Sequence, residues 1–165
     1  MRKFSPRPSL DLVPIRQATP DDLPAIRKLE QQAETAAHWA EREYDALFAP
    51  EAPARIALLA TGDADVPDIR GFVIARAACE EWEIENLVVA APHRRSGVAS
   101  ALLRELLRTA AAGGAAWVLL EVRESNVAAR QLYEKIGFSQ AGRRAGYYRG
   151  PFEDGLQLKI SVAVP

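Results

Sequence analysis

A turn of small and basic residues carries the sharpest chemical signal in the sequence. It reads Arg94-Arg95-Ser96-Gly97-Val98-Ala99 and lies between a strand-like segment and a long helix-like segment. Small residues at the start of a helix leave several backbone N–H groups pointing in one direction, and the helix dipole adds positive potential. The turn therefore predicts a pyrophosphate site. The alternative is an ordinary loop with a solvated basic pair, since the Gly-Lys-Ser/Thr of a nucleotide P-loop is absent.

Two side chains able to exchange protons follow this turn. Glu121 comes directly after the apolar run Trp117–Leu120, and Tyr133 lies beside Leu132 in a helix-like segment. A partly desolvated carboxylate can accept a proton, and a phenol with a reference pKa of about 10 can donate one at neutral pH. Each residue also has a purely structural explanation, as a polar strand end or as an aromatic on the buried face of a helix.

A strand–helix–strand unit must position these residues. Its parts are predicted at residues 82–89, 97–112 and 117–122, and Gly113-Gly114 ends the helix. Such a unit makes its two strands parallel, with a right-handed crossover. The apolar residues of the helix recur at the spacing of a half-buried face, and they are Ala99, Leu102, Leu103, Leu106, Leu107 and Ala110.

The remaining pattern completes one α/β (α+β) domain over residues 13–165, preceded by a flexible arm at residues 1–12. A helix is predicted to begin at Thr19-Pro20-Asp21-Asp22, and Ser125 is predicted to cap a later one that ends at Gly137. The other predicted elements are strands at 13–18, 55–61 and 69–79, a short helix at 40–48, and a closing hairpin of 138–148 with 156–164.

Taken together, residues 83–138 resemble the acetyl-CoA core of the GNAT superfamily of N-acetyltransferases. The family pattern Arg/Gln-x-x-Gly-x-Gly/Ala is matched at 94–99, after the strand Asn86-Leu87-Val88-Val89. The second half is matched by Leu120–Asn126 and by Ala128–Phe138. The resemblance implies a mixed, mostly antiparallel sheet of about seven strands with one parallel pair at the acetyl-CoA site, and about four helices.

The resemblance also implies acetyl-CoA as co-substrate and no metal. It implies that the CoA pyrophosphate lies on the backbone of the turn, that the pantetheine pairs like a strand with residues 87–89, and that Asn126 contacts the cofactor. The expected cofactor-binding residues are Leu87, Val88, Val89, Arg94, Arg95, Ser96, Gly97, Val98, Ala99, Ser100 and Asn126.

Catalytic roles follow from the same resemblance. It assigns Glu121 as the proton acceptor and Tyr133 as the proton donor to the departing CoA thiolate. Within the superfamily, the chain most resembles bacterial enzymes that acetylate the N-terminal alanine of a small-subunit ribosomal protein. This likeness implies an acceptor site that includes His38, Trp39, Tyr147 and Tyr148, and it extends to Glu153-Asp154.

The ionisation of amines also favours a peptide N-terminus. At pH 7 roughly 10–15% of an α-amine is neutral, against about 0.04% of a lysine, so a single glutamate suits the α-amine without excluding lysine. A small-molecule amine (a polyamine, an amino acid or an aminoglycoside) stays an alternative, for which Glu80, Glu81, Glu83 and Glu85 would supply an acidic groove. A non-catalytic acyl-CoA-binding module is a third reading, and an intact Glu121 and Tyr133 argue against it.

The composition of the chain indicates which classes of partner and ligand to expect. The 165 residues hold 21 Lys and Arg against 22 Asp and Glu, so no direct binding to nucleic acid or to a membrane is expected. Cys79 is the sole cysteine, which fits a cytoplasmic protein, and we expect it inside a core strand. His38 and His93 lack further ligands at metal-binding spacing, so we expect no metal site.

Overall fold

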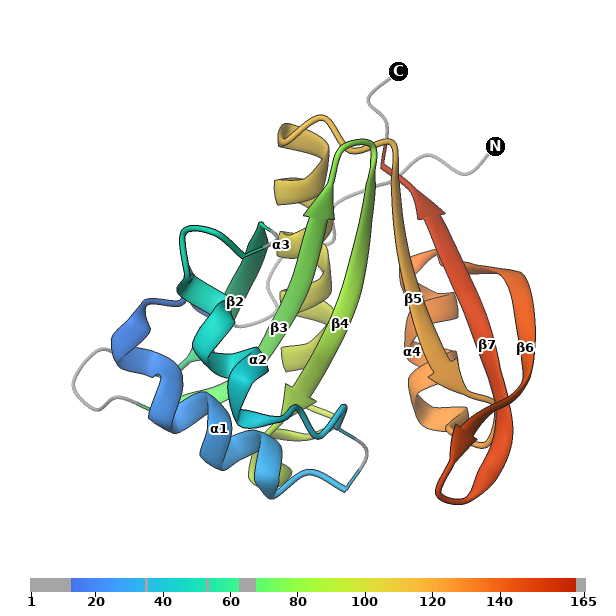
Figure 1. The fold of residues 1–165 in the computed structure, drawn as a ribbon, viewed down its shortest axis with the longest axis horizontal. Helices are drawn as coiled ribbons and strands as arrows, with labels where there is room; N and C mark the ends of the chain where they lie inside the picture. The colour runs from blue at the N-terminus through green and yellow to red at the C-terminus, as the bar shows by residue number, and fades with distance from the viewer. Residues whose placement is uncertain (1–12, 35, 53, 63–67, 163–165) are drawn as a thin grey trace.

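A seven-stranded sheet forms the centre of the computed structural model, which describes residues 13–34, 36–52, 54–62 and 68–162 (Figure 1). The strand order is β1-β2-β3-β4-β5-β7-β6, and every neighbouring pair is antiparallel except β4 with β5. The predicted mixed sheet with one parallel pair is therefore confirmed, whereas the predicted arm lies outside the described residues. The strands are β1 Ile15–Gln17, β2 Arg55–Thr61, β3 Ile69–Ala78, β4 Glu81–Val89, β5 Trp117–Arg123, β6 Ser139–Arg149 and β7 Phe152–Ser161.

Four α-helices in the described part of the chain cover the two faces of this sheet. One face, over β2 to β4, carries α1 (Leu23–Gln31) and α2 (Glu41–Asp45) (Figure 1). The opposite face carries α3 (Val98–Ala112) and α4 (Val127–Ile136), which share one hydrophobic cluster. Single turns of 3-10 helix occur at Pro20–Asp22, Ala46–Phe48 and Ala91–His93.

The apolar face of α3 anchors the crossover between the parallel strands. Leu102, Leu103, Leu106 and Ala110 are fully buried, as the helical spacing predicts. Apolar burial is the dominant favourable contribution to folding. The start of α3 is consequently held in a fixed place beside β4.

Two local predictions were wrong. The residue that caps α4 is Asn126, whose side-chain oxygen accepts a hydrogen bond from the N–H of Ala129 at 3.2 Å. Ser125, the predicted cap, instead donates its hydroxyl to Glu153 at 3.0 Å. Cys79 is exposed rather than in the core, because β3 ends at Ala78 and Cys79 lies in the turn to β4 with φ 49°.

The parallel strands β4 and β5 separate part of the way along. Their pairing covers Glu81–Ile84 against Trp117–Leu120 and then ends. Beyond this point β4 continues against β3 to Val89, while β5 continues against β7 to Arg123 (Figure 1). A register shift against β3 leaves Glu85 as a bulge at the point of separation, and a bulge bends its strand. The inner edges of both strands are thereby left without a partner strand.

Candidate active site

The turn before α3 presents a row of unused backbone donors. The N–H groups of the six residues from Arg95 to Ser100 have no hydrogen-bond acceptor among the described residues. Gly97 has φ 88°, a left-handed conformation that favours glycine, and nothing lies within 4 Å of the position where a Cβ would stand. A run of free N–H groups at the start of a 15-residue helix fits the predicted pyrophosphate site.

The inner edge of β4 offers the predicted place for an extended ligand. The N–H of Ala90 donates to Arg70 on β3 at 2.8 Å, and backbone groups alternate along a strand. The N–H and C=O groups of Val89 and Leu87 therefore point away from β3, toward the side where β5 has separated. Arg94 confirms this direction, because its Nε donates to the carbonyl oxygen of Val89 at 3.3 Å. The predicted turn and the predicted strand segment are thus adjacent.

Glu121 lies on β5, just after the last pair with β4. Its side chain is 14% exposed, and its neighbours Leu120 and Val122 point into the opposite face of the sheet. One carboxylate oxygen, Oε1, lies 3.0 Å from Nη1 of Arg144. The other, Oε2, is buried and has no hydrogen-bond partner within the described ranges. A buried oxygen in this state is able to accept a proton or a hydrogen bond from a ligand.

Tyr147 and Tyr148 of β6 lie near this carboxylate, and Tyr133 of α4 belongs to the hydrophobic cluster on the other face of the sheet. The pKa of the Tyr147 hydroxyl is raised, mainly by the Glu121 carboxylate and to a lesser extent by burial. The Tyr147 and Tyr148 rings meet edge to face with centroids 5.0 Å apart. Burial and then the charge of Glu121 raise the pKa of Tyr148 to about 12. Tyr133 is buried, and its pKa is also raised to about 12, by burial first and then by the charge of Tyr148. The structure therefore brings Glu121, Tyr147 and Tyr148 together, and Tyr133 is linked to this group through Tyr148.

The other predicted acceptor residues, His38 and Trp39, lie on the β4 side of the separation. Trp39 packs against the core under α1 and α2, and its ring centroid is 5.4 Å from that of Tyr44. The Arg55 guanidinium stacks over the Trp39 ring at 5.3 Å and pairs with Glu85, the bulged residue of β4, at 2.6 Å. His38 is exposed, with φ 51°. Trp39 is thus a packing residue. Through Arg55 it is linked to Glu85, and it therefore lies near the point where β4 and β5 separate.

The glutamates that would make an acidic groove are mostly neutralised. Glu81 pairs with Lys159 at 3.3 Å, Glu83 pairs with Arg76, and Glu85 pairs with Arg55. The hollow beside Glu121 has a volume of about 210 Å³ and contains both Arg76 and Arg144. Each of its three carboxylates, on Glu81, Glu83 and Glu121, is paired with a cation, which does not favour a ligand with several positive charges.

Sequence reasoning missed Arg144, the cation on the candidate base. The signal available was the basic pair Arg143-Arg144 shortly before Tyr147-Tyr148. It also missed that the side-chain oxygen of Asn126 caps α4, so that only its NH₂ group remains to donate to a ligand. The described ranges contain no helix long and apolar enough to cross a membrane, and they contain no cluster of three or more His, Cys, Asp or Glu residues suited to hold a metal.

Comparison with known sequences gives related enzymes. The model of a family described as the acetyltransferase (GNAT) family matches residues 23–138. The ribosomal protein bS18-alanine N-acetyltransferase of Escherichia coli is 35% identical over 144 residues, which cover 87% of this chain and 91% of the relative. The N-alpha-acetyltransferase RimI of Mycobacterium tuberculosis is 42% identical over 85 residues, or 52% of each chain.

Comparison with solved structures agrees. The ribosomal-protein-S18-alanine N-acetyltransferase from Escherichia coli matches with a TM-score of 0.79 and 28% identity, over 92% of this chain and 95% of the other. Arabidopsis thaliana NAA60 in complex with acetyl-CoA matches with a TM-score of 0.77 over 89% and 98% of the two chains. At 19% identity the second likeness shows the fold alone.

Proposed function

Because the chain belongs to the GNAT family and is an acetyl-CoA-dependent N-acetyltransferase, we propose that its acceptor is the N-terminal alanine α-amine of a small-subunit ribosomal protein. One observation carries the proposal, namely the likeness to the Escherichia coli bS18-alanine N-acetyltransferase over nearly the whole length of both chains. The ribosomal protein is then the macromolecular partner of this enzyme.

Acetyl-CoA is proposed to lie along the separation of β4 and β5. The free N–H groups from Arg95 to Ser100 support a pyrophosphate at the start of α3. The unpaired edge of β4 at Leu87–Val89 supports an extended pantetheine arm. The NH₂ group of Asn126 is proposed as a further donor to the cofactor.

We propose that one acid–base residue acts on the acceptor amine and the other on the CoA sulfur. Oε2 of Glu121 accepts a proton from the amine, directly or through water, as the nitrogen forms its bond to the acetyl carbon. The N–H of Val89 donates to the carbonyl oxygen, which gains negative charge. Tyr133 gives its proton to the sulfur as the carbon–sulfur bond breaks, so CoA leaves as a thiol. A pKa of about 12 keeps Tyr133 protonated, and hence able to donate, throughout the working range of pH.

The alternative acceptors have weaker support. Polyamine binding would be served by free carboxylates, whereas Glu81, Glu83 and Glu85 are engaged by Lys159, Arg76 and Arg55. With a lysine acceptor, Glu121 would have to deprotonate an amine that is almost wholly protonated at pH 7.

A direct assay tests the acceptor. The purified chain would be incubated with acetyl-CoA and one of four amines: a peptide starting with alanine, the same peptide N-terminally blocked but carrying a lysine, spermidine, or free alanine. Mass spectrometry should find one acetyl group on the free N-terminus and a much higher rate there than on the other amines. A preference for spermidine or for the blocked peptide would overturn the α-amine assignment. Binding of acetyl-CoA without any product would support the non-catalytic module.

A further inference from the structure

Strand β6 contains a three-residue bulge opposite a single residue of β7. Arg144 pairs with Gly155, and Tyr148 pairs with Glu153. The three β6 residues from Ala145 to Tyr147 therefore face Asp154 alone. Gly146, in the middle of the bulge, has φ 59°. Such a bulge redirects the side chains that flank it.

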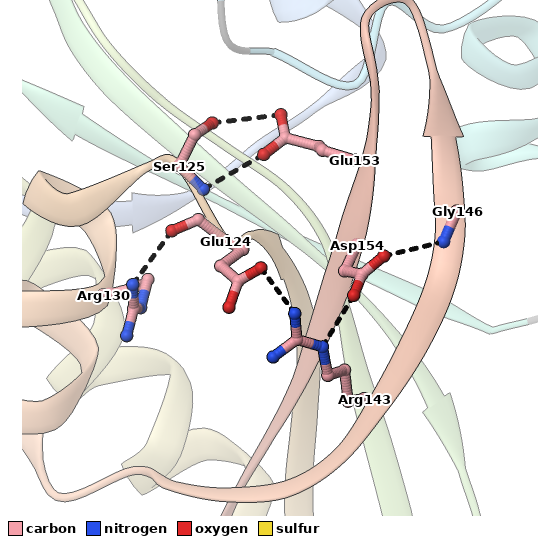
Figure 2. A network of polar contacts seen from close by, with 7 residues as sticks. All are labelled: Glu124, Ser125, Arg130, Arg143, Gly146, Glu153 and Asp154. Atoms are coloured by element: carbon pink, nitrogen blue, oxygen red, sulfur yellow. Dashed lines mark hydrogen bonds and ion pairs between the residues drawn. The ribbon is translucent and has the colours of Figure 1, made fainter.

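The Asp154 carboxylate closes this bulge from across the hairpin. Its Oδ1 accepts a hydrogen bond from the N–H of Gly146 at 2.9 Å (Figure 2). Its Oδ2 accepts one from Nε of Arg143 at 2.6 Å, and Arg143 also donates to Glu124 at 2.8 Å. The Gly146 and Arg143 bonds hold the pKa of Asp154 below its ordinary value, because both favour the charged carboxylate. The two oxygens thus have separate tasks, one on the bulge and one on an ion pair.

The bulge redirects the side chain of Tyr147, which packs against Gly155 of β7. A Cβ added to Gly155 would stand 3.1 Å from Cδ1 and 3.2 Å from Cβ of Tyr147. The ring of Tyr147 therefore lies against the backbone of β7, where only glycine leaves room for it. In this position the Tyr147 ring lies beneath the Arg144 guanidinium at 5.2 Å, and Nη1 of the same guanidinium lies 3.0 Å from Oε1 of Glu121.

We propose that Asp154 is a positioning residue that sets the shape of the β6 bulge and thereby holds Tyr147 and Arg144 against Glu121. The catalytic meaning of this arrangement rests on the proposed function, because that function gives Glu121 its role. Asp154 itself does not touch the acceptor. The bulge, Gly155 and Asp154 together fix the wall of the acceptor site.

A simpler role for Asp154 would be to fasten the β5–α4 corner to the hairpin through Arg143 and Glu124. Three variants separate the two roles. Asp154→Asn keeps an oxygen for the Gly146 N–H and removes the charge that pairs with Arg143. Asp154→Ala removes both contacts. Arg143→Gln removes the ion pairs and leaves the bulge contact in place.

Kinetics give the first readout. We expect Asp154→Ala to lower kcat/KM for the alanine peptide on the order of 10- to 100-fold, as misplacement of an active-site wall does, with KM for acetyl-CoA unchanged. Asp154→Asn and Arg143→Gln should stay close to wild type. Equal losses in all three folded variants would overturn the proposal in favour of the fastening role.

NMR gives a second readout that does not need any activity. The Hα proton of Gly155 that occupies the Cβ direction faces Cδ1 and Cγ of the Tyr147 ring, so the Gly155 Hα chemical shifts should carry a ring-current contribution. This contribution should disappear in Asp154→Ala and persist in Asp154→Asn. An unchanged Gly155 signal in folded Asp154→Ala would overturn the positioning role, even if the proposed acceptor is right. If the wild type shows the predicted shifts but acetylates no peptide, the proposed function fails instead.

A variant in the bulge itself covers the case in which Asp154→Ala does not fold. Gly146→Val strains a backbone with positive φ and leaves Asp154, Arg143 and Glu124 intact. It should displace the Tyr147 ring and lower kcat/KM for the peptide, as Asp154→Ala is expected to do. A Gly155 signal and a kcat/KM for the peptide that both match wild type would contradict the proposal.

Discussion

Arg144 holds one oxygen of Glu121 and leaves the other free. Its Nη1 lies 3.0 Å from Oε1, while Oε2 is buried with no partner within the described ranges. Arg144 is about half exposed, whereas Glu121 is mostly buried, so the arginine lies on the solvent side of this ion pair. The carboxylate is thus fixed in orientation by its outer oxygen, and its inner oxygen remains for the acceptor.

Replacing Glu121 by glutamine should make the enzyme depend on the acceptor's own ionisation. Glutamine keeps the shape and cannot accept a proton, so the deficit of Glu121→Gln should be largest near pH 6–7. It should shrink as the pH approaches about 9, where most of an α-amine with a pKa of about 7.7–8.0 is already neutral. Rates measured across this pH range with an alanine peptide test the prediction. A deficit that does not change with pH would mean that Glu121 orients the acceptor and does not take its proton.

Removing the Tyr133 hydroxyl should slow turnover with little effect on stability. Tyr133→Phe preserves the edge-to-face contact with Phe138, whose ring centroid is 5.7 Å away. If Tyr133 protonates the thiolate, kcat should fall about 10²-fold or more. Stopped-flow turnover and a thermal melt measure the two quantities. The control is Tyr44→Phe, since Tyr44 is equally buried on the α1 side of the sheet and should leave kcat unchanged. Similar kcat values for the two variants would reduce Tyr133 to a packing residue.

A negative charge at Gly97 should weaken acetyl-CoA binding through repulsion of the pyrophosphate. Any side chain at this position meets the same strain from φ 88°, so Gly97→Gln serves as the matched control for Gly97→Glu. Calorimetry should give at least roughly tenfold weaker binding for the Glu variant than for the Gln variant, with the gap narrowing as salt screens the charge. Equal affinities of two folded variants would remove this turn from the pyrophosphate site.

Asp22 should stabilise the fold above about pH 4 and lose this effect in acid. The bidentate hydrogen bonds from Arg16 at 2.7 and 2.8 Å, together with contacts from Thr19, lower the pKa of Asp22 from 3.8 to about 2. A lowered folded-state pKa means that the stabilisation is present above the unfolded pKa and is lost as pH falls through the folded one. Asp22→Asn should therefore cost on the order of 2 kcal/mol at pH 7, and much less near pH 2.

Urea denaturation of the wild type and Asp22→Asn at several pH values measures this difference. Glu41→Gln is the control, because Glu41 also pairs with an arginine but is mostly exposed to solvent, so its removal should change stability little. A gap between wild type and Asp22→Asn that widens toward pH 2 would contradict the assignment.

The sequence predicted what depends on local pattern. The helical spacing of Leu102, Leu103 and Leu106 identified the buried face of α3, and the small residues around Gly97 identified the turn that leaves its amides free. Both signals are contained within a few consecutive residues. The mixed sheet of about seven strands with one parallel pair followed from the family resemblance, which adds information that no single segment holds.

The missed features depend on partners distant in the chain. The bulge at Glu85 exists only because β3 pairs with β4 out of step, and the bulge around Gly146 is closed by Asp154 from another strand. Arg144 meets Glu121 across 23 residues of chain. Ser125 had the right residue type for a cap, yet its hydroxyl was taken by Glu153. Neither periodicity nor residue type records such pairings.

The separation of β4 from β5 also bears on self-association. A sheet with an open edge commonly recruits a strand from a second molecule, which makes such edges an aggregation hazard. Here the unpaired part of β4 faces inward, with the β5–β7–β6 half of the same sheet across from it. A second copy would have to push that half aside to add a strand. The protein can therefore expose hydrogen-bonding backbone to a small, slender ligand while denying it to a neighbouring polypeptide.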